Sequence, residues 1–368
     1  MGIPMHACLV LEDGTTVKGE GFGAEKEVLG EVVFNTSMTG YQEALTDPSY
    51  KGQILILTYP LIGNYGVNTK DYESDRIKVE GFAVREYCHF PSHRKGEKTI
   101  NQFLKENGKP GIAGIDTRAL TIKIRKYGTM KGALKTSKEE IDSEELLFKA
   151  KKQPDISEKD LVKLVTSPKI ERYEQKSDTE IVLLDCGMKL SILKNLLLRD
   201  ANVTVVPATT TSKEILDLEP NGIMVTNGPG DPLMANYVVN TLKDLLEELP
   251  ISGICFGNQL LALAAGGKTY KLKFGHRGSN QPVKDLATRR VYITSQNHGF
   301  AVDGNSLGGT GFEVSHINPN DNSVEGMIHK ELPIFSVQYH PEAHPGPWDS
   351  NYIFDEFLKS VRKNNAKA

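Results

Sequence analysis

One cysteine in this 368-residue chain stands where a catalytic nucleophile would be expected. Cys255 is the centre of Gly253-Ile254-Cys255-Phe256-Gly257, which follows a short apolar run. Glycines two places on either side of a nucleophile permit a sharp strand-to-helix turn, in which a larger side chain would clash. Such a turn places the sulfur at a helix N-terminus, whose dipole and free N–H groups favour a thiolate. The pentapeptide also fits a cysteine that only packs in a core, and both interpretations stay open at this point.

A nucleophilic cysteine needs a base, and the base needs an acceptor that orients it. His340-Pro341-Glu342 offers both. Proline keeps the preceding residue extended, and side chains two residues apart in an extended chain project to the same side. Glu342 is therefore expected to bind one imidazole nitrogen of His340 and to leave the other for the sulfur. The alternative is a histidine at a strand end beside a solvated glutamate.

Acyl transfer also requires donors for an oxyanion. The turn supplies the backbone N–H of Phe256. Gly228, in Asn227-Gly228-Pro229-Gly230-Asp231-Pro232, can bring a second N–H close because it has no side chain to block the approach. As a bare pattern, Gly-Pro-Gly also fits a simple turn. The same segment lacks the Lys and Ser/Thr of a phosphate-binding loop.

The second half of the chain alternates strand-like and helix-like segments, which predicts a doubly wound, mostly parallel sheet in an α/β fold. Ligands bind at the carboxyl ends of strands in such sheets, where Gly228 and Cys255 both fall. The predicted strands are 181–185, 203–206, 222–226, the short apolar run 251–254, 291–294, 296–300, 312–316, 324–329 and 334–339, and the main helices are 191–199, 236–248, 258–265 and 353–361.

The first part of the chain has a different character. Residues 1–135 predict a β-rich α+β domain, with helices at 99–107 and 118–126. The polar segment 35–50 is expected to be a surface loop. Residues 136–178 are rich in charge and predict a linker that contains helix, and residues 179–363 form the second domain.

Composition sets limits on function. The net charge of −3, with 25% charged residues, gives no basic excess for nucleic acid. No apolar run reaches the roughly 20 residues of a membrane helix, and no secretory signal pattern opens the chain, so neither a membrane nor export is expected. The four scattered cysteines predict free thiols in a reducing cytoplasm. Cys88, His89 and His93 supply too few ligands for a structural zinc site, and no metal is expected.

Taken together, these motifs resemble a known family. Residues 180–363 resemble a class I (triad) glutamine amidotransferase domain in the segments 227–232, 253–259 and 340–342 and in their order. The whole chain resembles the small, glutamine-hydrolysing subunit family of carbamoyl phosphate synthetase. The further matching segments are 34–50, 114–118, 280–283 and 296–300.

The resemblance implies roles for individual residues. Cys255 would be the nucleophile, His340 the general base and acid, and Glu342 the residue that orients it. Backbone N–H groups of Gly228 and Phe256 would form the oxyanion hole. The glutamine would be held by Ser49, Gly230, Gln259, Asn297, Gly299 and Phe300. The family often has His after the glycine of the turn, whereas this chain has Asn258. The position lies outside the triad, so the chemistry is expected to survive, and any difference is expected in substrate positioning or in coupling.

The resemblance also implies partners. Ammonia from L-glutamine would pass to a separate large synthetase subunit in a heterodimer or higher assembly. That subunit would bind ATP and magnesium, and this chain would carry no cofactor. The product would serve arginine or pyrimidine synthesis. Two alternatives remain open: the amidotransferase component of another pathway, such as anthranilate or guanylate synthesis, and a non-catalytic regulatory subunit on the same fold.

Overall fold

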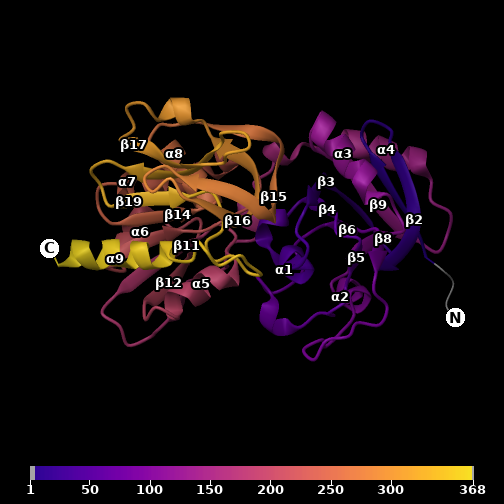
Figure 1. The fold of residues 1–368 in the computed structure, drawn as a ribbon, viewed down its shortest axis with the longest axis horizontal. Coiled ribbons are helices and arrows are strands. Elements are labelled where there is room, and N and C mark those ends of the chain that lie inside the picture. The colour runs from indigo at the N-terminus through magenta and orange to yellow at the C-terminus, as the bar shows by residue number, and fades with distance from the viewer. Residues whose placement is uncertain (1–4, 367–368) are drawn as a thin grey trace. The chain divides into compact units, whose positions relative to one another are not determined.

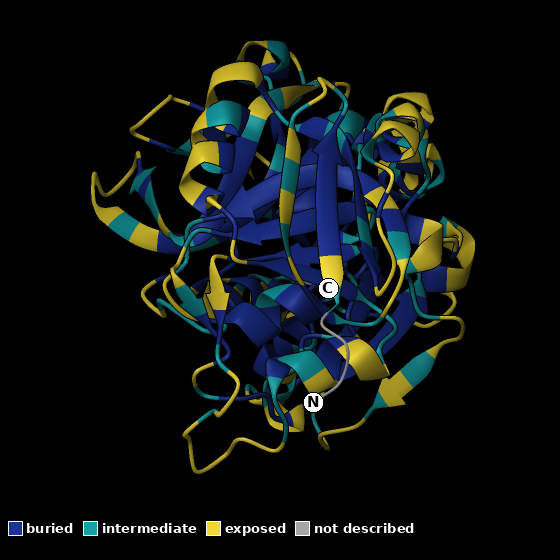
Figure 2. Cartoon of the chain, turned by 90° about the vertical axis from the view of Figure 1, so that its right-hand side faces the viewer, coloured by how far each residue is buried: buried dark blue, intermediate teal, exposed yellow. Residues whose placement is uncertain are grey.

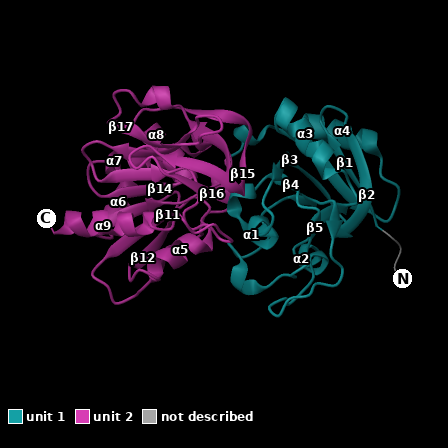
Figure 3. Cartoon of the chain, in the orientation of Figure 1, with its two compact units in different colours: residues 1–159 teal, residues 160–368 magenta. Residues whose placement is uncertain are grey.

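The computed structural model describes residues 5–366. Contacts divide the chain into two compact units, residues 1–159 and 160–368 (Figure 3). The division falls inside the segment 136–178 that the sequence predicts as a linker. Each unit has its own sheet and its own buried clusters, so each is described separately.

Five parallel strands form the centre of the sheet in the second unit (Figure 1). Their spatial order is β12, β11, β13, β14, β19. Their bounds are β11 (Glu180–Asp185), β12 (Asn202–Pro207), β13 (Gly222–Val225), β14 (Ile251–Ile254) and β19 (Ile334–Val337). The chain goes from β11 to its neighbour β12 and then continues with β13, β14 and β19 on the opposite side of β11. This is the doubly wound arrangement that the alternating sequence predicts.

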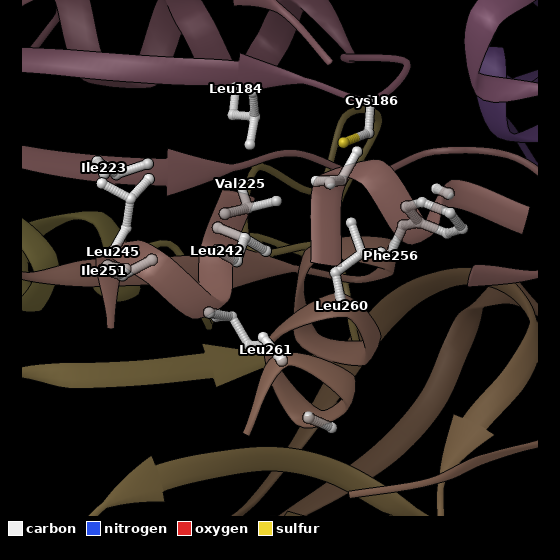
Figure 4. Packing of buried hydrophobic residues seen from close by; sticks show 14 of the residues in the cluster. Leu184, Cys186, Ile223, Val225, Leu242, Leu245, Ile251, Phe256, Leu260 and Leu261 are labelled. Carbon is white, nitrogen blue, oxygen red and sulfur yellow. The ribbon is translucent and has the colours of Figure 1, made fainter. Parts of the chain in front are cut away.

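Helices cover both faces of this sheet, because successive residues of each buried strand point to opposite sides. Val182 and Leu184 of β11 belong to the cluster that contains α7 and α8 (Figure 4), whereas Ile181 and Leu183 belong to the cluster that contains α5 and α9. The helices are α5 (Leu190–Leu197), α6 (Ser212–Leu216), α7 (Asn236–Leu245), α8 (Phe256–Ala264) and α9 (Ile353–Asn365).

Antiparallel strands extend the sheet. β10 (Glu171–Tyr173) pairs with β12, and β18 (Val324–His329), β17 (Phe312–Ile317), β15 (Thr269–Asp285) and β16 (Val291–Val302) continue beyond β19. Two differences from the sequence-based assignment appear here. Strands predicted at 291–294 and 296–300 are one continuous strand, and β15 was not predicted. Register shifts between Lys271 and His276 and between Gly278 and Gln281 interrupt the period-two pattern of β15, which removes its sequence signal.

A closed seven-stranded barrel forms the first unit, in the order β1-β2-β8-β6-β4-β3-β9. Figure 2 shows buried strands beneath exposed helices and loops. The barrel strands are β1 (His6–Leu11), β2 (Thr16–Gly23), β3 (Glu27–Asn35), β4 (Gln53–Leu57), β6 (Gly81–Ala83), β8 (Pro110–Ala113) and β9 (Met130–Ser137). β5 (Leu61–Ile62) pairs with β7 (Glu86–Tyr87), and the helices include α2 (Ile100–Glu106) and α3 (Thr117–Tyr127). The β-rich α+β prediction for this part is confirmed.

The expectation of a surface loop at residues 35–50 is wrong. The segment contains α1 (Tyr41–Thr46) and a 3-10 turn, Pro48–Tyr50, and most of it is buried. Its apolar members Tyr41 and Leu45 join the core of the first unit. Two of its buried polar side chains have partners inside the protein: Gln42 Nε2 donates to the carbonyl of Asn68 at 2.8 Å, and Thr46 Oγ1 donates to that of Gln42 at 2.9 Å. Polar composition indicates a surface only when such partners are lacking.

Charged residues of 136–159 also belong to the first unit. α4 (Ser143–Lys152) starts at Asp142, whose carboxylate accepts hydrogen bonds from the N–H groups of Glu144 and Glu145. Leu146 and Ala150 pack against the barrel strands β1 and β9. The helix therefore shows a charged face to solvent and an apolar face to the barrel, and its high charge alone does not indicate a linker.

Candidate active site

The turn at Cys255 has the strained geometry that its glycines predict. Cys255 lies between β14 and α8 with φ 56° and ψ −99°, a backbone conformation that non-glycine residues rarely adopt. A Cβ on Gly253 would lie 2.6 Å from the carbonyl carbon of Gly257, and one on Gly257 would lie 2.3 Å from the Val225 oxygen. Both positions therefore require glycine. The turn leaves Cys255 at the N-terminus of α8.

The next parallel strand brings His340 to the same edge of the sheet. β19 pairs with β14 in parallel register, and the Cys255 N–H donates to the Val337 carbonyl at 2.8 Å. His340 follows β19 by three residues, and its N–H donates to Ser295 of β16 at 2.9 Å. Because parallel strands end at a common edge, residues 85 positions apart in sequence meet there.

The His340 ring is oriented as the sequence predicts. Its Nδ1 lies 2.5 Å from Oε1 of Glu342, and both side chains are buried. Nε2 makes no hydrogen bond within the described chain. Burial lowers the pKa of His340, but the Glu342 carboxylate and Cys255 outweigh it and raise that pKa to about 10.

A buried lysine that the sequence analysis did not single out completes this cluster. Lys189 Nζ lies 3.1 Å from Glu342 Oε1 and 3.4 Å from the Ala343 carbonyl. Burial raises the pKa of Glu342, but Lys189 and then His340 outweigh it and lower that pKa to about 2. Glu342 is therefore a carboxylate that stabilises positive charge on the imidazole. The position of Lys189, shortly after the end of β11, was the available sequence signal.

The candidate oxyanion donors lie at the same edge. α8 begins at Phe256, so its N–H is among those without an acceptor inside the helix. A Cβ on Gly228 would lie 2.5 Å from the Cys186 oxygen and 3.1 Å from Cδ1 of Phe256. Only glycine allows the 227–232 segment to approach the turn so closely. Gly230 has φ 84°, which also favours glycine.

The structure places the remaining predicted residues as follows. Gln259, in the first turns of α8, donates to the Phe300 carbonyl of β16 at 2.8 Å. The carbonyl of Asn297, on β16, accepts from the Cys255 thiol at 3.6 Å. Gly299 lies in the same strand, where a Cβ would lie 3.2 Å from the Arg277 guanidinium. Gln259, Asn297 and Phe300 therefore lie at the sulfur or against α8. Contact of these three and of Gly299 with glutamine stays a prediction.

Ser49 belongs to the first unit. It lies in the turn Pro48–Tyr50, and its N–H donates to the Asp47 carboxylate at 2.9 Å. Its side chain is buried within the described chain. A role for Ser49 at the glutamine remains a prediction from the resemblance.

Family models match both units. Residues 9–134 match the carbamoyl-phosphate synthase small chain, CPSase domain, and residues 182–360 match the glutamine amidotransferase class-I family. The carbamoyl phosphate synthase small chain of Archaeoglobus fulgidus is 54% identical over 98% of this chain and 99% of its own length. The chain belongs to the carbamoyl phosphate synthase small chain family.

Further small chains show the same full-length similarity. That of Methanocaldococcus jannaschii is 56% identical, covering 96% of this chain and 99% of its own, and that of Methanopyrus kandleri is 54% identical, covering 98% and 100%. Similarity at this level spans both units of the small chain. The class-I amidotransferase match coincides with the doubly wound unit that contains Cys255, His340 and Glu342.

No described helix has the length and apolar character of a membrane span; the longest, α9, has 13 residues and an amphipathic sequence.

Proposed function

We propose that this small chain hydrolyses the side-chain amide of L-glutamine at Cys255 and supplies the ammonia to a large synthetase subunit. One observation carries the proposal: a strained cysteine at a helix N-terminus beside a histidine held by a buried carboxylate, in a chain more than half identical to carbamoyl phosphate synthase small chains. Similarity to small chains in both units favours this over the anthranilate or guanylate alternative.

In the proposed reaction, the Cys255 sulfur attacks the amide carbon and its proton resides on His340. Backbone N–H groups of Gly228 and Phe256 stabilise the oxyanion that forms. His340 then protonates the nitrogen, the C–N bond breaks, and ammonia leaves a γ-glutamyl thioester on Cys255. A water molecule, deprotonated by His340, attacks the thioester and releases glutamate.

The charges of His340 and Glu342 support the roles proposed for them. The raised pKa of His340 means that its ring readily accepts and holds the proton that Cys255 gives up when the sulfur attacks. The carboxylate of Glu342 accepts the hydrogen bond of the proton on Nδ1 and stabilises the imidazolium that forms when Nε2 also takes a proton. Gly230, Gln259, Asn297, Gly299, Phe300 and Ser49 are proposed to hold the glutamine.

The partner is proposed to be the large subunit of carbamoyl phosphate synthase, in a heterodimer or higher assembly. ATP and magnesium would bind on that subunit, and the small chain would need no cofactor of its own. Co-purification from the native source, followed by an assay for ATP-dependent carbamoyl phosphate synthesis, tests this part of the proposal.

Cys255→Ser tests the chemistry. The variant should lose glutamine-dependent synthesis by the complex and keep ammonia-dependent synthesis, because only amide cleavage needs the thiolate. Cys88→Ser is the matched control, since Cys88 is a free, partly exposed thiol of the first unit and should leave both activities intact. Substantial glutamine hydrolysis by Cys255→Ser would reject the nucleophile, and a wild-type small chain without glutaminase activity in the complex would favour a regulatory subunit.

A further inference from the structure

A side chain other than His340 hydrogen-bonds to the sulfur of Cys255. Gln338 lies just after β19, two residues before His340, and is completely buried. Its Nε2 donates to Cys255 Sγ at 3.6 Å. In an extended chain, residues two apart project to the same side, so Gln338 and His340 approach the sulfur from one stretch of backbone. Sulfur is a large acceptor, and 3.6 Å is a normal hydrogen-bond distance to it.

The hydrogen-bond network fixes which end of the Gln338 amide faces the sulfur. The Phe300 carbonyl can only accept, so the Gln259 atom 2.8 Å away must be its NH₂ group. That NH₂ also lies 3.2 Å from the other amide atom of Gln338, which must then be the acceptor, Oε1. The remaining end of Gln338, its NH₂, therefore faces Cys255.

Further contacts hold this orientation. Asn258 Nδ2 donates to Gln338 Oε1 at 3.2 Å, and Asn258 Oδ1 accepts from Ser336 Oγ at 2.9 Å. The backbone N–H of Gln338 donates to the Glu325 carbonyl at 2.9 Å. The amide is thus pinned at its oxygen and at its backbone, and its NH₂ is preorganised toward the sulfur.

The two polar contacts of the sulfur respond differently to its ionisation. The thiol donates to the Asn297 carbonyl at 3.6 Å, and that bond disappears when the proton leaves. The N–H of Gln338 can donate to the thiolate as well, and a hydrogen bond to a charged acceptor is stronger than one to a neutral acceptor. Gln338 therefore favours the charged form of the sulfur over the neutral form.

We propose that Gln338 is a further catalytic residue, a hydrogen-bond donor that stabilises the Cys255 thiolate and fixes the direction of its sulfur. The proposal rests on Cys255 being the nucleophile of the proposed function. Asn258 and Gln259 are positioning residues in it, because they act on the sulfur only through the Gln338 oxygen.

Gln338→Leu tests the proposal through alkylation of Cys255 by iodoacetamide, followed by mass spectrometry of the Cys255 peptide as a function of pH. Iodoacetamide reacts with the thiolate, so the profile measures ionisation without requiring glutamine turnover. The titratable groups linked to the sulfur are His340, then Glu342 and Lys189 behind it, and His298 on β16, which interacts with His340. Glu325 of β18 contacts the backbone of Gln338. All five are unchanged in Gln338→Leu.

The midpoint of alkylation should move upward by about one pH unit, which lowers the thiolate fraction about tenfold below the midpoint. Loss of the donor should also reduce kcat/KM for glutamine about tenfold or more, with the larger part in kcat. Gln338→Met should shift the midpoint in the same direction, because methionine is close to glutamine in length but carries neither a hydrogen-bond donor nor a charge. It provides the same readout if the leucine variant does not fold.

Gln153→Leu is the matched control. Gln153 is a buried glutamine of the first unit whose Nε2 donates to the Gly132 carbonyl at 3.0 Å, so its replacement also removes a buried amide. Its alkylation profile should match that of the wild type. Wild-type profiles in both Gln338 variants would overturn the role of Gln338. Glutaminase activity retained in Cys255→Ser would instead overturn the proposed function and leave the alkylation result intact.

Discussion

Two buried histidines of the second unit lie beside carboxylates, and their ring nitrogens face different groups. His340 gives Nδ1 to Glu342 at 2.5 Å and keeps Nε2 on the side of Cys255. His276 has Asp321 2.8 Å from Nε2 and Glu325 3.3 Å from Nδ1, so both of its nitrogens face carboxylates. A general base needs one nitrogen available to the reacting group. His340 meets this requirement, whereas His276 is suited to hold a positive charge in the sheet.

The carboxylates around the two rings also differ in origin. Glu342 is two residues from His340, on the same segment, and is compensated by Lys189. The partners of His276 come from the loop before β18 and from β18 itself. His276, His298 and Glu325 also bring potential metal ligands within 4.8 Å of one another. Asp321 lies at hydrogen-bond distance from Nε2, and Glu325 faces Nδ1 at ion-pair distance without a hydrogen bond, an arrangement that fits an imidazolium between two carboxylates.

The largest effect should come from His340→Asn. Without a proton acceptor, the rate of glutamine hydrolysis should fall at least about a thousandfold, because nucleophile and base act as a unit. Ammonia-dependent synthesis by the complex should persist. Ammonia release from glutamine measures the first activity, and carbamoyl phosphate formation measures the second. A loss of less than tenfold would mean that His340 is not the base.

Glu342→Gln should damage the glutamine rate less than His340→Asn does, by about tenfold or more. Glu342 orients the ring and stabilises its charge but transfers no proton, and an orienting carboxylate generally leaves part of the rate when it is removed. Steady-state kinetics of the two variants side by side make the comparison. If Glu342→Gln were the more damaging change, the roles of the two residues would have to be reversed.

His276→Gln should alter stability rather than chemistry. Burial lowers the pKa of His276, but Asp321 and Glu325 outweigh it and raise that pKa to about 9. A raised pKa means that the stabilisation, about 3 kcal/mol, is complete below the ordinary pKa near 6.5 and is lost as the pH rises through 9. The melting temperature of the wild type should exceed that of the variant most at pH 6 and least at pH 10.

A difference in melting temperature that stays constant from pH 6 to pH 10 would contradict the imidazolium at His276. Removal of metal ions with EDTA tests whether the cluster of His276, His298 and Glu325 holds a metal ion. It should leave the wild-type melting temperature unchanged, whereas a marked fall would show that the cluster holds a metal ion rather than a proton.

The smallest effect should come from Asn258→His. Asn258 contacts Gln338 and Ser336 but not the sulfur, and Gln259 still donates to the Gln338 oxygen when Asn258 is replaced. The glutamine rate should stay within about tenfold of the wild-type rate, or roughly 1.4 kcal/mol in barrier height. A larger fall in kcat, measured with the unchanged Gln259, would mean that Asn258 is the main support of Gln338.

The sequence alone determined the local parts of this site. Glycines at 253 and 257 predict the turn, because any Cβ there would clash with backbone. His340 and Glu342 meet because an extended chain puts them on one side two residues apart. The doubly wound order follows from alternating strands and helices, and parallel strands must end at one edge, which brings Cys255 and His340 together.

Only the tertiary structure decided what depends on contacts between distant segments. Lys189 reaches Glu342 across 153 residues of chain, and the orientation of Gln338 follows from Gln259 and the Phe300 carbonyl. The polar segment 35–50 is buried because its side chains find partners such as Asn68, which composition cannot show. β15 carries register shifts that hide its period. Residue type and spacing reflect interactions between residues that are close in sequence. Burial and charge compensation depend on residues that are distant in sequence and that only the folded structure brings together.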